Sequence, residues 1–401
     1  MTAIPRRRFL ASSTMAASPM LGWSAVHAST APERSTHASS ANPWKLLAVA
    51  PASRKMPELA RDYRRGVELG LAQHPEVPLQ LQWVDAQAVP SKAAREIADQ
   101  IDSRSDLHGI FGWMPSALAE RVVAYANDRH LPLWVSDTGA DLPANATRNK
   151  PQAQRTHSLE LCDCAATLAR EVFMQKGARA VLAVGWLESG YDFVYAFEHA
   201  YRALGGQVTA RHIGGPVEPS REFDGLRRTI LEQRPDAVVA LYSGAQAVRF
   251  GQWWRANAQA QGPWSLAGLP WLAQGDVPVD TLMVGAWPLA GSAAGGDWQH
   301  QFERAGLQWS ATALLGAEAG FSIGASLRGM GAQPSNSALR DAWSQAALQG
   351  PRGHRAWKPQ GSAGSLWVSL ASSVVSARVT AAPRVEAHSS ISGWLNGYLQ
   401  T

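Results

Sequence analysis

One stretch of the sequence, Ala180 to Val208, constrains the fold more than any other. It begins with the short apolar run Val181 to Val184, which stops at Gly185. After a loop, apolar and aromatic residues recur every three or four positions as far as Leu204, and two glycines then end the pattern. This order predicts a buried strand, a loop, an amphipathic helix with a glycine C-cap and a further strand. Such units build parallel sheets, which bind ligands at the carboxyl ends of their strands.

The same alternation of strand and helix patterns continues on both sides of this unit. Before it, we expect strands at 45–50, 79–84, 109–112 and 131–135, with helices at 59–71, 93–101 and 117–126. After it, we expect strands at 237–241, 265–268, 283–286 and 366–370, with helices at 223–231, 245–260, 314–330 and 337–348. The pattern predicts an α/β protein with two doubly wound parallel-sheet lobes. The polar stretch 141–155 is the expected crossing between them.

The first 28 residues have the three parts of an export signal. Arg6 to Arg8 precede Phe9-Leu10, a modest apolar region follows, and a small-residue cleavage pattern ends at Ala28. The paired arginines predict a twin-arginine signal peptide that is cleaved after Ala28, and so a periplasmic protein. Residues 29–43, rich in Ser, Ala and Thr, are expected to form a flexible tether.

Composition excludes several classes of partner. The formal charge of +5 falls to +2 without the leader, which holds three arginines and no acids, and no basic run remains to bind nucleic acid. No later apolar stretch approaches the ~20 residues needed to span a bilayer. Cys162 and Cys164 lie two apart in a helical pattern, where a disulfide would be strained and further metal ligands are missing. We therefore expect no cofactor and no metal.

Several motifs, taken in succession, resemble the type I periplasmic solute-binding proteins. They are GIFGWMPS at 109–116, LPLWVSDTGA at 131–140, GWLESGYDFVYAFEHAYRALGGQV at 185–208 and PDAVVALY at 235–242. The late segments 317–330 and 342–353 also fit, so the resemblance covers about 44–370. The most similar branch is that of the branched-chain amino acid (Leu/Ile/Val) receptors of ABC transporters.

The resemblance implies how the chain is organised. In this family the ligand lies between two lobes that close about a hinge, and the closed form docks on an ABC permease in the inner membrane. The implied lobes are 44–150 plus 285–355 and 151–284 plus 356–401, in a chain expected to be a monomer.

The resemblance also implies a ligand site in the loops that follow the strands. In the first lobe it points to Trp113, Ser116, Ser136, Asp137 and Thr138. In the second lobe it points to Trp186, Glu188, Tyr191, Tyr242 and Trp271. The hydroxyls of Ser136 and Thr138 suit a carboxylate or other acceptor, although capping of the following helix is an equal alternative.

One departure from the family argues against an α-amino acid ligand. Its amino acid receptors hold the ammonium with an acid near the position of Trp271, but here no acid occurs before Asp276. Four tryptophans instead follow expected strands, at 113, 186, 271 and 287. They suit an aromatic, apolar, sugar-like or amine-bearing ligand, unless they only pack loops on the core. Glu188 and Asp137 are the candidates for a charge in the site.

The sequence favours binding over catalysis. Gly320 to Gly324 match G-x-S-x-G around Ser322, but the preceding residues continue a helical pattern, whereas a nucleophile elbow follows a strand. The predicted function is capture of a small molecule for an ABC importer. A ligand-sensing subunit for a membrane kinase or chemoreceptor is the alternative, and an exported hydrolase a third.

Overall fold

The computed structural model describes residues 42–52, 58–86, 89–141, 154–214, 221–262, 264–274, 277–328, 330, 335–358, 361–363, 366–371 and 376–379. The expected signal peptide, most of the tether and the weakly patterned tail at 387–399 lie outside these ranges.

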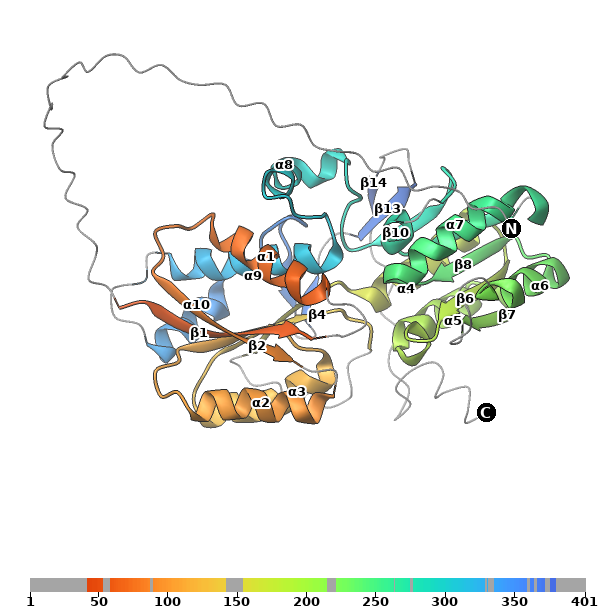
Figure 1. The fold of residues 1–401 in the computed structure, drawn as a ribbon. Helices are drawn as coiled ribbons and strands as arrows, with labels where there is room; N and C mark the ends of the chain where they lie inside the picture. The colour runs from red at the N-terminus through yellow and green to blue at the C-terminus, as the bar shows by residue number, and fades with distance from the viewer. Residues whose placement is uncertain are drawn as a thin grey trace, which may run out of the picture. The chain divides into compact units, whose positions relative to one another are not determined.

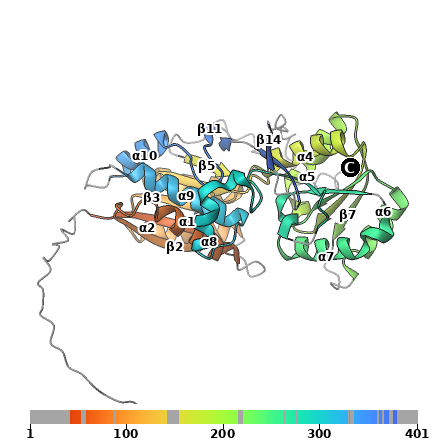
Figure 2. The same ribbon diagram turned by 90° about the horizontal axis from the view of Figure 1, so that it is seen from above.

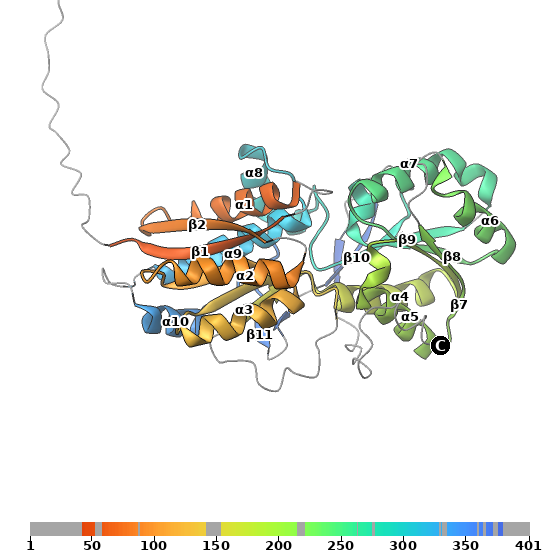
Figure 3. The same cartoon turned by 60° about the horizontal axis from the view of Figure 1, so that its bottom comes forward.

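The first of the two large sheets is entirely parallel, with strand order β2-β1-β3-β4-β5. Its strands are β1 (Trp44–Pro51), β2 (Leu79–Ala86), β3 (Gly109–Trp113), β4 (Leu133–Asp137) and β5 (Gln154–Ser158). Helices α2 (Pro90–Asp102) and α3 (Ser116–Asp128) cover one face, and α1 (Glu58–Leu71) and α9 (Ala311–Leu327) the other (Figures 1 and 3). Successive residues of β1 point to opposite faces, so Leu46 packs with α1 and α9, and Leu47 with α2 and α3. We call this sheet and its helices the first lobe.

The second sheet has strand order β14-β13-β10-β9-β8-β6-β7. Five of its strands are parallel: β6 (Arg179–Gly185), β7 (Gln207–Gly214), β8 (Ala237–Leu241), β9 (Ser265–Gly268) and β10 (Leu282–Gly285). Helices α4 (Leu161–Gln175) and α5 (Asp192–Ala203) lie on one side, with α6 (Asp224–Gln233) and α7 (Gly244–Gln261) on the other (Figure 2). This sheet and its helices form the second lobe. The predicted fold class, two α/β lobes built on parallel sheets, is confirmed.

Two details differ from the sequence-based prediction. The late strand β13 (Leu366–Leu370) is antiparallel to its neighbour β10. It also pairs with the antiparallel edge strand β14 (Ser376–Val379), because the connection between these two strands is too short for the crossover that a parallel pair needs. Strand β5 hydrogen-bonds to β4, so the first sheet extends past the boundary expected at residue 150. Its polar sequence, QRTHS, hides the usual signature of a buried strand.

The remaining elements complete the later part of the chain. They are α8 (Gly296–Arg304), α10 (Asn336–Gln345), the short antiparallel pair β11 (Ala356–Lys358) and β12 (Gly361–Ala363), and the 3₁₀ segments η2 (Glu188–Gly190), η4 (Pro270–Gln274) and η5 (Ala293–Gly295). Cys162 and Cys164 lie in the first turn of α4 and are not joined by a disulfide. They are buried more completely than expected, and their sulfurs donate to the carbonyls of Ala140 and Leu159.

Glycines bring α1 and α9 into backbone contact. A Cβ on Gly66 or Gly70 of α1 would collide with the carbonyl oxygens of Ala313 and Ala317. A Cβ on Gly316 or Gly320 of α9 would collide in the same way with backbone oxygens of α1. The small-residue pattern of α9 therefore serves packing, because it lets the two helix axes approach closely.

This contact makes a test of the packing. Gly320→Ala should lower the free energy of unfolding by ~2–3 kcal/mol, because the added methyl overlaps the Val67 carbonyl and forces the helices apart. Urea denaturation followed by far-UV circular dichroism measures the change. Gly190→Ala is the matched control, since nothing lies within 4 Å of the Cβ it would add, and it should change the stability by less than ~0.5 kcal/mol. Equal effects of the two substitutions would contradict the close packing.

Candidate functional site

The first-lobe residues of the expected site lie at the carboxyl ends of β3 and β4. Trp113 ends β3, and its buried ring meets the Tyr63 ring edge-on, with centroids 5.9 Å apart. Ser116 begins α3, and Asp137 ends β4. Strands β3 and β4 are neighbours in the sheet, so these positions come together as expected.

Asp137 changes what this end of the lobe can bind. Its Oδ1 accepts the backbone N–H of Thr138 at 2.7 Å, and its Oδ2 accepts the Ser116 hydroxyl at 3.2 Å. The Ser116 hydroxyl and the Thr138 amide therefore serve the protein's own carboxylate, whereas the Thr138 hydroxyl oxygen accepts the Ala140 N–H at 3.2 Å. A carboxylate ligand would find these donors engaged and a negative charge beside them.

Ser136 is turned inward, in contrast to the expectation that its hydroxyl contacts a ligand. Its side chain is fully buried, and its Oγ lies 2.8 Å from the Tyr63 hydroxyl and 2.6 Å from His157 Nε2. His157 Nδ1 in turn lies 2.9 Å from Glu318 Oε2. The order Ser136–His157–Glu318 is that of a Ser–His–acid relay, but the buried hydroxyl accepts the Tyr63 hydrogen bond and presents no nucleophile to solvent.

The second-lobe residues gather at the ends of β6 and β8. Glu188 follows β6 and is only 7% exposed, and its Oε1 accepts the Ser243 hydroxyl from the end of β8. Its Oε2 has no hydrogen-bond partner among the described residues. Burial raises the pKa of the Glu188 carboxyl, against the opposing effect of the Ser243 hydrogen bond. The carboxyl group is thus held at the strand ends, with one oxygen bonded to Ser243 and the other buried.

Tyr191 joins the acidic residues of the two lobes. It caps α5, and burial followed by the negative charges of Asp141, Glu188 and Asp137 raises the pKa of its phenol. Burial, and then Asp192 and Asp137, raise the pKa of Asp141 to about 6. The charges that act most strongly on Asp141 and Tyr191 are all negative, so this part of the protein attracts a positive group.

Hydrogen bonds connect the loop after β4 to α5. The Phe193 N–H donates to the Ala140 carbonyl at 2.9 Å, and the Asp141 carboxylate accepts the N–H of Asp192. The first turn of α5 therefore lies against the loop that carries Asp137 and Thr138. This contact explains how acids from distant parts of the sequence come to act on one tyrosine.

The remaining aromatic residues divide into exposed and packed rings. Trp186 is 62% exposed at the tip of the β6–α5 loop. Trp271, in η4, is partly buried and meets Trp287 edge-on at 5.6 Å. Tyr242 is 1% exposed and packs on Phe250 in the second-lobe core, which turns it away from the role expected for it, and its hydroxyl has no partner among the described residues. Trp186 and Trp271 therefore remain accessible, whereas Tyr242 does not.

Asp141 and Ser243 were not among the site residues expected from the sequence. Both lie one position beyond a quoted motif, Asp141 after LPLWVSDTGA and Ser243 after PDAVVALY. Each follows the carboxyl end of a predicted strand, a signal that identifies them once the strand ends are known. His157 and Glu318 had no such signal, because one lies in a polar strand and the other in the middle of a helix.

Other features of the described chain do not form a second candidate site. A cavity of about 500 Å³ opens at the amino ends of β1 and β2, beside Lys45, Gln80 and Arg104, away from the strand ends discussed above. Ser322 lies inside α9 and bonds the backbone of Gln349, so G-x-S-x-G forms no elbow. Among the described residues no three His, Cys, Asp or Glu side chains cluster in a way that could hold a metal. None of the described helices has both the length and the apolar character needed to cross a membrane.

Comparisons with known proteins identify the family and the fold. A family model described as periplasmic binding protein matches residues 43–367. No curated protein sequence matches the chain. A solved ABC-transporter solute-binding protein from R. palustris in complex with benzoate is similar, with a TM-score of 0.69 and 20% identity over 86% of this chain and 98% of that one.

Two amino acid receptors are also similar in structure. The leucine binding protein LivK from Thermotoga maritima has a TM-score of 0.64 and 14% identity over 85% of this chain and 99% of that one. LivJ from Streptococcus pneumoniae, in complex with isoleucine, has a TM-score of 0.65 and 11% identity over 84% and 98%. At these identities the solved structures show a shared fold alone. The family match, however, spans most of the sequence, and the chain belongs to the periplasmic binding protein family.

Proposed function

We propose that this protein is the substrate-binding component of an ABC import system and captures a small molecule between its two lobes. Members of its family are solute-binding proteins, and similar structures carry small ligands such as benzoate and isoleucine. The ligand contacts loops of both lobes and draws them together, so that the closed form is populated in proportion to the ligand's preference for it. Binding, and not catalysis, is the proposed activity.

The ligand we propose has an apolar or aromatic body and a positively charged, hydrogen-bond-donating nitrogen. The observation that carries this proposal is Asp137, whose carboxylate already takes the Ser116 hydroxyl and the Thr138 amide. Asp141 and Glu188 add acceptors nearby, and the exposed ring of Trp186 and the partly buried ring of Trp271 offer apolar and cation–π surfaces. An acid at position 271 is not required, since these other acids replace it.

The same proposal assigns a compartment and a partner. The arginine-rich leader at 1–28 directs export through the twin-arginine route, and cleavage after Ala28 leaves a periplasmic protein. The closed, ligand-bound form then docks on an ABC permease in the inner membrane. The protein acts as a monomer in this scheme.

The proposed charge of the ligand is testable by thermal shift. Among amino acids, amides, aromatic acids, amines and sugars, aromatic amines should raise the melting temperature most, because a ligand that binds the native state stabilises it. At a ligand concentration of ~100 times Kd the gain is ~2.7 kcal/mol. A larger shift with benzoate-like acids or with branched-chain amino acids would contradict the proposed ligand class. No shift with any of the five classes would contradict the proposed function itself.

Ionisation of Asp141 makes a second test. Its pKa of about 6 means that the carboxyl gains a proton as the pH falls through 6, and its attraction for a cation is then lost. Affinity for an aromatic amine should therefore rise by about tenfold between pH 5 and 7.5, the size of one charge–charge interaction at ~10 Å in an effective dielectric of ~20. Isothermal titration calorimetry at both pH values measures the change.

Two variants control this pH test. Asp141→Asn should remove most of the pH dependence and leave the weak, low-pH affinity at both pH values. Asp106→Asn removes an exposed acid, paired with Lys45 at 2.5 Å near the amino end of β1, and should leave the profile of the wild type. A profile that is the same in Asp141→Asn as in the wild type would show that another group controls the affinity.

A further inference from the structure

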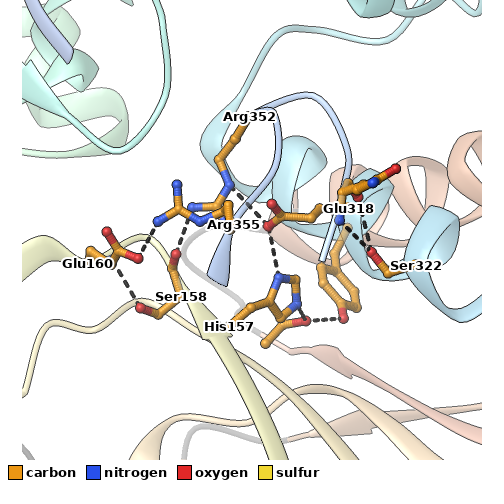
Figure 4. Close-up of polar contacts among 10 residues, drawn as sticks. His157, Ser158, Glu160, Glu318, Ser322, Arg352 and Arg355 are labelled. Atoms are coloured by element: carbon orange, nitrogen blue, oxygen red, sulfur yellow. Dashed lines mark hydrogen bonds and ion pairs between the residues drawn. The ribbon is translucent and has the colours of Figure 1, made fainter. Parts of the chain in front are cut away.

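A buried chain of hydrogen bonds and ion pairs centres on Glu318. This carboxylate is 0% exposed in the middle of α9, and its Oε2 accepts from His157 Nδ1 at 2.9 Å and from Arg352 Nε at 3.1 Å (Figure 4). Burial alone would raise the pKa of Glu318, but the positive charge of Arg352 and the His157 hydrogen bond outweigh it and lower the pKa to about 2. Glu318 therefore stays ionised and must keep both donors.

One arm of the chain reaches the carboxyl end of β4. Burial lowers the pKa of His157, so the ring is neutral and, with Nδ1 donating to Glu318, its Nε2 accepts the Ser136 hydroxyl. Ser136 can then accept only from Tyr63, whose hydroxyl lies 2.8 Å away. The charge on Glu318 thus determines which group donates and which accepts in every hydrogen bond of this arm. Ser136 directly precedes Asp137, on which the proposed ligand site is built.

The other arm reaches the places where the chain passes between the lobes. Arg352 Nη1 donates to the Ser158 carbonyl at 2.6 Å, and Arg355 forms a buried ion pair with Glu160 (Figure 4). Ser158 ends β5 of the first sheet, and Glu160 precedes α4 of the second lobe in a left-handed conformation with φ 54°. The two arginines precede the segment that leads to β13 of the second sheet. The two arginines therefore link their own segment, which leads to β13, to the segment that connects β5 to α4. We call these two segments the two passages between the lobes.

We propose that His157, Glu318 and Arg352 are positioning residues that couple the ligand-binding end of β4 to these two passages, and so set the balance between lobe arrangements. The inference rests on the proposed function for the location of the ligand. Its physical basis is that one carboxylate oxygen serves both arms. A shift of Ser136 moves His157, and Glu318 can follow only if Arg352 and its contact with Ser158 adjust as well.

Spin labels on the two lobes test the coupling in the full chain. The substitutions Tyr125→Cys in α3 and Leu231→Cys in α6, both at exposed positions, carry the labels. Pulsed electron–electron double resonance gives the distance distribution without any ligand. Glu318→Gln keeps the size of the side chain but removes its charge, and should shift the distribution from that of the wild type. Ser326→Ala, two turns along the same helix, removes a hydroxyl that donates to the Ile323 carbonyl of α9 itself, and should leave the distribution unchanged.

Ser136→Ala is the second variant, and together with Glu318→Gln it completes a double-mutant cycle. It should also shift the distribution, and the double variant with Glu318→Gln should shift it no further than the larger single effect, because both act on one chain. If Glu318→Gln fails to fold, the Ser136→Ala result alone decides. Folded variants with the wild-type distribution, additive shifts, or an equal shift in Ser326→Ala would overturn the inference. Because these measurements use no ligand, they are independent of whether any compound class binds to the wild type.

Discussion

A single buried carboxylate is the constraint on which much of this structure depends. Glu318 lies in α9, and the glycines of this helix let it pack closely against α1. The charge of Glu318 therefore lies in the interior of the first lobe. Breaking such a buried pair by removal of one partner costs about 3–5 kcal/mol, so the donors His157 and Arg352 must be delivered from elsewhere in the chain. One comes from β5 and the other from the segment after α10. The packing of α9 therefore determines where the chain passes between the lobes.

The chemistry of the proposed ligand site follows from a different carboxylate. The side chain of Asp137 accepts the Ser116 hydroxyl and the Thr138 amide, so this strand end presents a negative charge to the proposed ligand. A scaffold shared with benzoate and amino acid receptors thus carries an acidic end, to which Asp141, Glu188 and Asp192 also contribute. Fold and ligand chemistry are separable in this way because the strand ends position whichever side chains follow them.

Regular elements were predictable from the sequence, whereas side-chain partners were not. Apolar runs such as Val181 to Val184 and the helical period of α5 depend on local pattern, and both are found where predicted. Strand β5 escaped prediction because its residues are polar and its burial comes from tertiary pairing. Ser136 was expected at the ligand, but its hydroxyl is claimed by Tyr63 and His157, which lie far away in sequence. Hydrophobic patterns in a sequence indicate periodicity and burial, but hydrogen bonds between polar residues far apart in the sequence produce no such pattern.

The most direct test of the account is to identify what the protein itself retains. Native mass spectrometry of the protein purified from its producing cells, followed by denaturation and identification of the released compound, requires no prior choice of ligand. The account predicts one small molecule per chain, with an aromatic or apolar body and a nitrogen that is protonated at neutral pH. Release of a carboxylic acid without a basic nitrogen would contradict the proposed role of Asp137, Asp141 and Glu188.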